Sequence, residues 1–294
     1  MISLFKLAAL LPLWVMRGIG LALGWLVWAA SGRYRAVMRE NWQAAIQSGR
    51  LSLDSPRARR LFRDAIGHAG LIAAELPKIW CDPKAIEKMS VSGFEQVQAL
   101  SDAGRPIIFL TPHLGAFELS ARKISTYMPL TVLYRPARQA VLRRLMEALR
   151  PLPRLFTAPA NAAGVRQLLR ALRKGEAVGM LPDQVPGQGD GVWADFFGKP
   201  AYTMTLPIRL AQATEAELVW VLAIRTRKGW HLDFSAWRTE GFQDLGLERA
   251  AELMNQALMA QIARAPEQYL WAYNRYKMPR HAVNAQASQG EQKK

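Results

Sequence analysis

The longest apolar stretch of the chain is LAALLPLWVMRGIGLALGWLVWAA, residues 7–30, in which Arg17 is the one charged residue. A helix that crosses a bilayer needs about 20 mostly apolar residues, so this stretch is long enough. Pro12 interrupts its first third, and an arginine at mid-bilayer costs on the order of 3 kcal/mol. A helix lying in the membrane interface, or a buried core helix, is therefore an alternative to a spanning one. We expect residues 1–32 to form an N-terminal membrane anchor. Arginines follow it at once and favour a cytoplasmic side for that flank: Arg33, Arg35 and Arg39.

The rest of the chain alternates short apolar runs with helical patterns. The runs that predict buried strands are 105–111, 130–134, 177–181, 218–225 and 231–237, with Lys228-Gly229 as a hairpin turn between the last two. The segments that predict helices are 33–80, 118–127, 141–149, 162–174, 206–213 and 250–264. This order predicts an α/β domain over residues 33–283, with a mixed, partly parallel sheet flanked by helices. The polar tail, residues 284–294, is expected to be disordered.

Composition restricts the partners of this domain. The 294 residues include 39 Lys or Arg against 23 Asp or Glu, a net charge of +16, and a single cysteine, Cys81. One cysteine excludes a disulfide scaffold and thiolate-rich metal sites. Between residues 135 and 174, Glu147 is the one acid among ten cations. So concentrated a charge indicates a surface for an anionic partner, and the segment lacks the interleaved aromatics of a single-stranded nucleic-acid platform.

His113 is the strongest candidate for chemistry. It follows the first buried run, in Thr111-Pro112-His113-Leu114-Gly115-Ala116-Phe117-Glu118, where open α/β sheets bind their ligands. If Gly115 lets the chain fold back, the Glu118 carboxylate can reach the imidazole. Such a pair orients the ring for general-base attack on a hydroxyl. A histidine that merely caps the following helix is the structural alternative.

Other kinds of site lack a sequence signature. The chain has no Gly-x-Ser-x-Gly elbow, no Gly-rich phosphate loop, and no spacing of His and acids typical of metal ligands. We therefore expect neither a covalent acyl-enzyme nor a metal or other cofactor.

Several motifs together resemble the bacterial lipid A biosynthesis (lauroyl/myristoyl) acyltransferases, within the glycerolipid/lysophospholipid acyltransferase superfamily. TPHLGAFE is similar to the family's His-x4-acid motif, although Ala116-Phe117 stands where the family commonly has Asn-Trp, a change that bears on the shape of the pocket. The other motifs fall in the family's order: Arg39-Glu40-Asn41, Val91-Ser92-Gly93, Tyr134-Arg135-Pro136, Pro182-Asp183-Gln184, Asp195-Phe196-Phe197-Gly198, Pro207-Ile208-Arg209, and Pro266 to Trp271 with Arg275, Tyr276 and Lys277. The resemblance covers roughly residues 5 to 280.

The resemblance implies an enzyme of the inner membrane, facing the cytoplasm, which transfers a fatty acyl chain from acyl carrier protein to a hydroxyl of a phosphorylated lipid A precursor. His113 would be the general base and Glu118 would orient it. Arg135 and Arg209 would bind phosphate of the acceptor or donor, or form structural salt bridges, and Asp183 would act at the site or cap its loop. The basic segment would meet acidic carrier protein and anionic lipids rather than nucleic acid. A lysophospholipid, ornithine lipid or other glycerolipid acceptor stays open, as does a non-catalytic, basic, membrane-tethered binding protein. The length of the acyl chain is also open.

Overall fold

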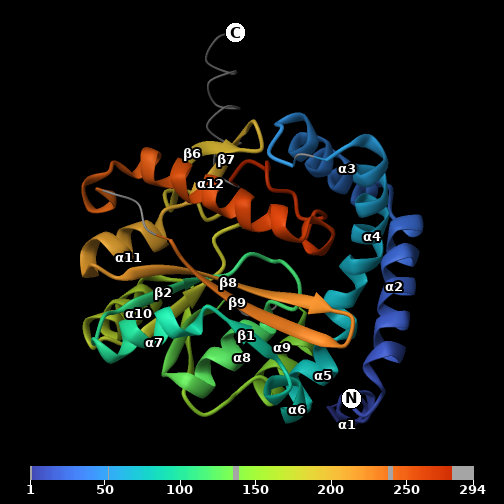
Figure 1. Cartoon of the computed structure of the whole chain (residues 1–294), viewed down its shortest axis with the longest axis horizontal. Coiled ribbons are helices and arrows are strands. Elements are labelled where there is room, and N and C mark those ends of the chain that lie inside the picture. The colour runs from blue at the N-terminus through green and yellow to red at the C-terminus, as the bar shows by residue number, and fades with distance from the viewer. Residues whose placement is uncertain (1, 52, 135–138, 238–240, 280–294) are drawn as a thin grey trace.

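A seven-stranded sheet forms the centre of the chain (Figure 1). The structure, a computed structural model, describes residues 2–51, 53–134, 139–237 and 241–279. The strands are β1 (Ser90–Ser92), β2 (Ile107–Leu110), β3 (Leu130–Tyr134), β4 (Leu155–Pro159), β5 (Ala177–Met180), β8 (Glu217–Thr226) and β9 (Gly229–Trp237). They lie in the order β1-β9-β8-β2-β5-β3-β4, and every pair is parallel except β8–β9. The predicted mixed, partly parallel sheet is confirmed.

Sequence and structure differ at the shorter and more polar strands. The runs taken as strands lie within a residue or two of β2, β3, β5, β8 and β9, whereas β1 and β4 were not expected. A separate antiparallel hairpin of β6 (Gly191–Phe196) and β7 (Lys199–Met204) was also missed. The hairpin turn between β8 and β9 lies one residue earlier than predicted, because Thr226 pairs with Gly229.

Helices cover both faces of the sheet, which explains why central strands such as β2 are buried along their whole length. One face packs against α10, α11 and α12, and the other against α5 and α7 to α9. The bounds are α5 Leu76–Cys81, α6 Pro83–Glu87, α7 Phe94–Asp102, α8 Glu118–Tyr127, α9 Ala140–Leu149, α10 Ala162–Arg173, α11 Leu206–Thr214 and α12 Leu247–Arg264, with 3-10 turns at Phe242–Asp244 and Pro266–Gln268.

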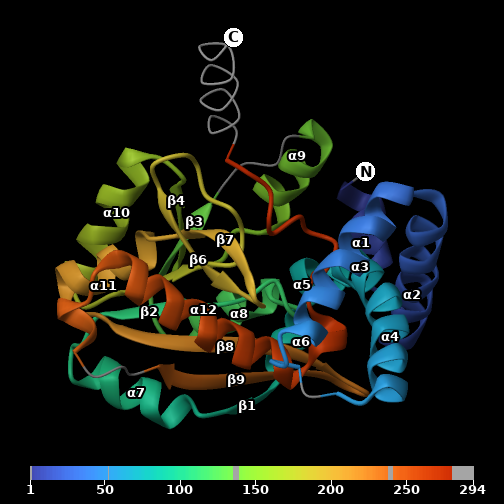
Figure 2. The same cartoon turned by 90° about the horizontal axis from the view of Figure 1, so that it is seen from above.

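The N-terminal apolar stretch forms two helices, α1 (Ile2–Ala8) and α2 (Leu13–Ala30), because Pro12 ends the continuous hydrogen bonding between them. Next come α3 (Gly32–Gln47) and α4 (Ser55–Ala74). By length and composition, α2 could cross a membrane. In this structure α2 lies alongside α4, at the right of Figures 1 and 2.

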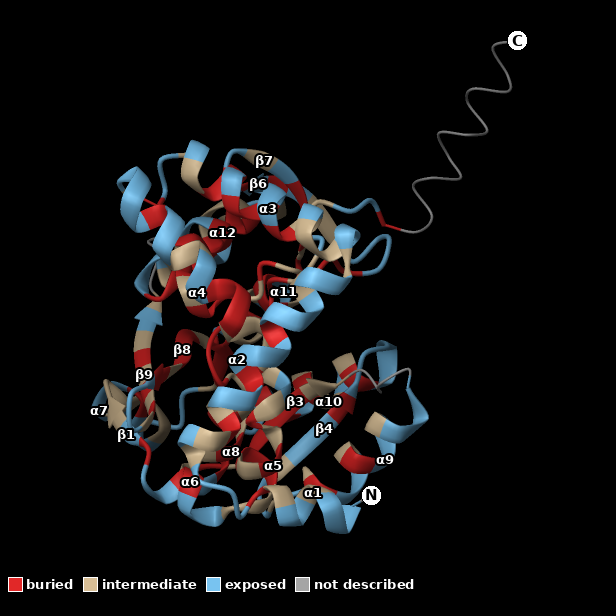
Figure 3. Cartoon of the chain, turned by 90° about the vertical axis from the view of Figure 1, so that its right-hand side faces the viewer, coloured by how far each residue is buried: buried red, intermediate tan, exposed pale blue. Residues whose placement is uncertain are grey.

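Glycines bring α2 and α4 into close contact. A Cβ at Gly24 would lie 2.3 Å from the Ile66 carbonyl oxygen, and one at Gly70 would lie 2.0 Å from that of Gly20. Small residues at such spacings let helix backbones approach closely. The outward face of α2 stays exposed and apolar (Figure 3). The stretch is therefore neither a buried core helix nor an isolated span.

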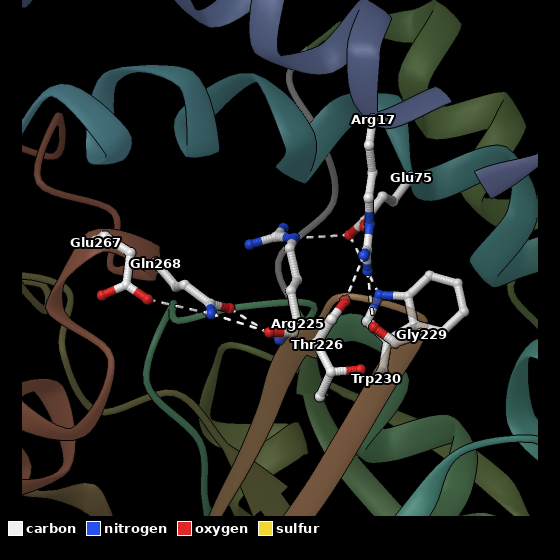
Figure 4. Close-up of polar contacts among 8 residues, drawn as sticks. All are labelled: Arg17, Glu75, Arg225, Thr226, Gly229, Trp230, Glu267 and Gln268. Atoms are coloured by element: carbon white, nitrogen blue, oxygen red, sulfur yellow. Dashed lines mark hydrogen bonds and ion pairs between the residues drawn. The ribbon is translucent and has the colours of Figure 1, made fainter. Parts of the chain in front are cut away.

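Arg17 points inward, onto protein groups (Figure 4). Its Nε donates to Glu75 at 2.8 Å, and its two Nη atoms donate to the carbonyl oxygens of Thr226 and Gly229 at the β8–β9 turn. Glu75 is fully buried and also accepts from Arg225 Nε at 2.7 Å and from Trp230 Nε1 at 3.3 Å. Arg17, which is unfavourable for a membrane helix in the sequence, therefore binds α2 to α4 and to the β8–β9 turn.

Replacing Glu75 by glutamine is expected to lower the free energy of unfolding by about 3–5 kcal/mol, because it leaves buried guanidinium groups without their carboxylate. Arg225 has two further buried nitrogens with no hydrogen-bond partner among the described residues, so nothing nearby compensates. Urea unfolding in detergent, followed by tryptophan fluorescence, measures the change. The matched control is Glu252→Gln, which breaks an exposed pair with Arg249 and should leave the transition in place. Equal transitions for both variants would contradict the argument.

Candidate active site

His113 lies just beyond β2, on a loop held between β8 and the segment that follows α12. Its carbonyl accepts from the Leu270 amide at 2.9 Å, while the Gly115 amide donates to the Gln268 carbonyl at 3.0 Å. Gly115 has a positive φ of 62°, and a Cβ there would lie 2.1 Å from the Ala223 carbonyl oxygen. Only glycine fits this position, so the chain turns at Gly115 as the sequence suggested, although the turn does not bring Glu118 to the ring.

Asp183 binds the His113 ring. Its Oδ1 lies 2.7 Å from His113 Nδ1, and its Oδ2 accepts from the His113 backbone amide at 2.8 Å. Asp183 is 2% exposed. Burial alone would raise the pKa of this carboxyl, but the charge and the hydrogen bonds of His113 hold it below its ordinary value. A buried carboxylate on Nδ1 fixes the proton there and leaves Nε2 as the basic nitrogen.

Strand pairing brings the two residues together. β2 and β5 are parallel neighbours, with Leu110 opposite Met180. His113 and Asp183 each follow that pair by three residues, and each comes directly after a proline. Two side chains 70 residues apart in sequence thus meet at the carboxyl edge of the sheet.

Gln184 approaches the other ring nitrogen. Its Nε2 lies 3.1 Å from His113 Nε2 and donates to it when that nitrogen carries the lone pair. The Phe117 ring lies 4.9 Å, centroid to centroid, from the imidazole. Neither residue was among the candidates taken from the sequence, although Gln184 lies in the Pro182-Asp183-Gln184 motif.

The expected contact between His113 and Glu118 is not made, so that geometric expectation is wrong. Glu118 begins α8 and accepts from Trp80 Nε1 at 3.2 Å, and it forms an ion pair with Arg150 at 3.1 Å. The reason is local: α8 starts at Glu118 and carries this side chain toward α5 and the end of α9, while Asp183 takes Nδ1 of the ring.

The remaining predicted residues are more dispersed. Arg135 lies outside the described residues. Arg209 is exposed, donates to Thr205 Oγ1 at 3.3 Å, and lines a cavity of about 750 Å³. Arg166 lines the same cavity, together with Pro186 and Gly187 from the loop that continues past Gln184. Arg209 is therefore near this loop, but it does not contact His113 or Asp183.

Two residues from the closing motif lie close to Asp183. Burial, and then the charge of Asp183, raise the pKa of Tyr269 well above its ordinary value, so this phenol stays neutral. Burial lowers the pKa of Arg275, while Tyr269 and Asp183 oppose that change. Arg275 donates to the Tyr202 carbonyl at 2.8 Å and to Thr203 Oγ1 at 2.9 Å, so it is held inside the protein rather than displayed to a ligand.

The described residues contain no group of three or more His, Cys, Asp or Glu that could hold a metal ion. What they do present is a histidine with a buried carboxylate behind it and a basic nitrogen directed toward an amide. This arrangement can accept a proton from a hydroxyl nucleophile.

Comparison with known proteins agrees with the motifs. Residues 1–278 match the family described as bacterial lipid A biosynthesis acyltransferase. The chain is 26% identical over 276 residues to the lipid A biosynthesis palmitoleoyltransferase of Escherichia coli (strain K12), covering 91% of this chain and 86% of the relative. It is 27% identical over 212 residues to the lipid A biosynthesis lauroyltransferase of the same organism, covering 71% and 68%. Because the match spans nearly its whole length, the chain belongs to the bacterial lipid A biosynthesis acyltransferase family.

Proposed function

We propose that this protein transfers a fatty acyl chain from acyl carrier protein to a hydroxyl of a lipid A precursor, with His113 as the general base. The observation that carries the proposal is the His113–Asp183 contact at the sheet edge, in a chain of this family. The relatives named for palmitoleoyl and lauroyl transfer differ in chain length, so the family name alone does not specify the acyl group.

The proposed reaction uses both ring nitrogens of His113. The Nδ1–H group remains hydrogen-bonded to Asp183 throughout. Nε2 accepts the proton of the acceptor hydroxyl as the hydroxyl oxygen attacks the thioester carbon. The tetrahedral intermediate then collapses, the carbon–sulfur bond breaks, and the imidazolium returns the proton to the leaving thiolate of the donor. Gln184 must yield its place on Nε2 to the acceptor hydroxyl. The products are an ester and a free thiol.

We assign donor and acceptor binding to the basic surface beside this site. Arg150 and Arg154 are excluded, because the first is paired with Glu118 and the second donates to the Tyr127 carbonyl. The other exposed cations among the described residues of this segment are on α9, on α10 and just after it: Arg143, Arg144, Arg166, Arg170, Arg173 and Lys174. They suit an acidic carrier protein, while Arg166 and Arg209 at the cavity suit phosphate groups of the acceptor.

We further propose that α1 and α2 lie in the plane of the cytoplasmic face of the inner membrane and do not cross it. α2 packs along α4, with Trp28 against Phe62 at a centroid distance of 5.5 Å. In the first half of α2, Arg17 binds the β8–β9 turn, which exposes Arg227 and Lys228. A spanning α2 would carry these two charges toward hydrocarbon, where each costs about 2.5–3.5 kcal/mol at the centre. An in-plane α2 instead embeds its exposed apolar face and keeps this turn in water.

Replacing Leu10 and Trp14 together by glutamate is expected to weaken binding to phosphatidylglycerol-containing vesicles on the order of 100-fold. Both side chains are 77% exposed, and embedding two such residues contributes about 3 kcal/mol. Flotation measures the binding. The matched control, Trp193→Glu, alters an exposed tryptophan on β6 and should leave binding unchanged. A cysteine at Ile2, in a Cys81→Ser background, tests the topology: labelling only from the periplasmic side would contradict the in-plane helix.

The acceptor is tested by deleting the gene and analysing lipid A by mass spectrometry, where loss of one acyl chain is expected. An unchanged lipid A would count against this acceptor. Purified protein supplied with acyl carrier protein thioester and either a lipid A precursor or a lysophospholipid then separates the two acceptors. Failure to acylate either one would favour a non-catalytic binding protein.

A further inference from the structure

Gly179 occupies an unusual place for a glycine. It lies inside the buried strand β5, opposite Phe109 of β2 and Val132 of β3. Glycine weakens a strand interior, because it adds no packing and loses the most backbone entropy. A Cβ here would meet only side chains, Val132 Cγ1 at 3.2 Å and Leu130 Cδ1 at 3.6 Å. Gly179 does not need a backbone conformation reserved for glycine, so the consequence of its missing side chain is that no methyl group presses on Val132.

Gly179 lines a narrow cavity between the sheet and α8. Its volume is about 40 Å³. Thr111 and Leu181, directly beyond β2 and β5, line one end, with Phe117 beside them. Phe117 contacts the His113 ring, so this end of the cavity adjoins the proposed general base. The sheet side and α8 contribute apolar walls, Phe109, Ala121, Ile124, Leu130 and Val132, while Glu118, Ser120 and Arg150 are the polar lining residues elsewhere.

A second cavity, of about 290 Å³, lies beneath α9. The two cavities share Val132 and Arg150 as lining residues. Met146 and Leu155 line the second, toward β4. Together they cross β2, β5, β3 and β4, and neighbouring strands are about 4.8 Å apart, so the path is about 14 Å long. We call these two cavities the acyl channel.

The Glu118–Arg150 ion pair lies where the two parts of the acyl channel meet. Both side chains are largely buried, with 14% and 19% exposed, and Arg150 lies over the Tyr134 ring at 5.6 Å. A pair that neutralises its own charge can border a hydrocarbon chain without leaving an unpaired charge there. This gives the acid of the His-x4-Glu motif a place in the site that does not require contact with His113.

We propose that the fatty acyl chain of the donor lies in the acyl channel, with its thioester at His113, and that Gly179 determines which chain lengths pass. This inference rests on the proposed acyl transfer. The first cavity is the narrow part, and at Gly179 a single methyl group would already press on Val132. Its ligand is an unbranched acyl chain that extends past Gly179 into the wider space under α9. The Glu118–Arg150 ion pair borders the passage between the first cavity and the second cavity under α9.

Full-length protein in detergent, carrying Gly179→Ala or Gly179→Val, tests the proposal. Equal amounts of octanoyl-, dodecanoyl- and hexadecanoyl-acyl carrier protein compete, and mass spectrometry gives the ratio of products. Relative kcat/KM is expected to shift toward octanoyl by about 10- to 200-fold, more for valine than for alanine. Ala177→Val is the matched control, because it enlarges a buried residue two positions earlier in the same strand that does not line the channel. An unchanged product ratio for Gly179→Val would overturn the proposal.

A binding measurement separates this inference from the proposed function. Octanoate and hexadecanoate displace a fluorescent fatty acid from the unmodified protein and from Gly179→Val. Weaker binding of hexadecanoate alone supports the channel even if the protein transfers no acyl group. Equal affinities in both proteins overturn it even if transfer is active. Thermal unfolding shows whether each variant is folded. If Gly179→Val is unfolded, the result for Gly179→Ala decides the test.

Discussion

Replacing His113 by alanine is expected to lower acyl transfer by about 10²- to 10⁴-fold, the contribution of a positioned general base. In the proposed mechanism the imidazole supplies the proton acceptor at Nε2, and alanine has no group in its place. The measurement is single-turnover transfer from acyl carrier protein thioester to lipid A precursor at saturating acceptor. Because the ring is not needed for the β2–β5 pairing, the variant should remain folded and bind vesicles like the parent protein.

A second histidine provides the control. His231 lies in β9, where its ring nitrogens contact Ser90 at 2.8 Å and Ser92 at 2.9 Å, on the sheet edge away from Asp183. Its replacement by alanine removes the same ring but leaves the proposed base in place, so transfer should continue. Undiminished transfer by purified His113→Ala protein would rule out the mechanism.

The central strands could be predicted from sequence because a parallel sheet covered on both faces needs continuous apolar runs. β2 and β5 are buried at every position, and both were expected. β4 lies at the edge of the sheet and exposes Phe156, so its pattern does not differ from that of a loop. β6 pairs only with β7, outside the main sheet, and its residues GVWADF show neither a polar–apolar alternation nor an uninterrupted apolar run.

The histidine could be predicted, and Asp183 was expected at the site or as a cap of its loop, but the contact between the two could not be predicted. His113 ends an apolar run, which is a local feature, whereas its contact with Asp183 depends on β5 lying next to β2. The residue pattern of a single segment does not predict the order of the strands in the sheet. The sequence does repeat one pattern, an apolar run followed by Leu-Pro or Thr-Pro and then His113 or Asp183, and this repetition was the available signal.

Charge in the apolar stretch presents the same difficulty. Arg17 appeared to be a penalty for a membrane helix, because its partner Glu75 lies 58 residues further along the chain. Once Glu75 neutralises it, the helix keeps one polar attachment to the body and one apolar face outward. The combination of a high net positive charge with abundant apolar residues is thus resolved by position: cations on α4, α9 and α10, apolar surface on α1 and α2.

Replacing Asp183 by asparagine is expected to lower kcat on the order of 10³-fold with little change in KM, because in the proposed mechanism the carboxylate acts through His113 and touches neither substrate. Asparagine keeps the size of the side chain but loses the charge that stabilises the imidazolium. If its amide nitrogen faces the ring, Nδ1 becomes an acceptor and the proton moves to Nε2, the nitrogen that must be free. Steady-state kinetics with the octanoyl donor gives the two parameters separately.

Glu118→Gln distinguishes the two acids of the site. The glutamine oxygen can still accept from Trp80 Nε1 and Arg150 Nε, but the amide nitrogen replaces the oxygen that accepts from Arg150 Nη2. Glutamine also no longer neutralises Arg150, so the acyl channel acquires an unpaired cation. We expect its main effect in KM for dodecanoyl and hexadecanoyl donors, with a far smaller loss of kcat for octanoyl than Asp183→Asn causes. If Glu118→Gln lowers kcat as much as Asp183→Asn does, Glu118 and not only Asp183 orients the His113 ring, which would contradict this assignment. The split between kcat and KM is decisive because a carboxylate that holds the base changes the rate with every donor, whereas one that borders the channel acts only on chains long enough to reach it.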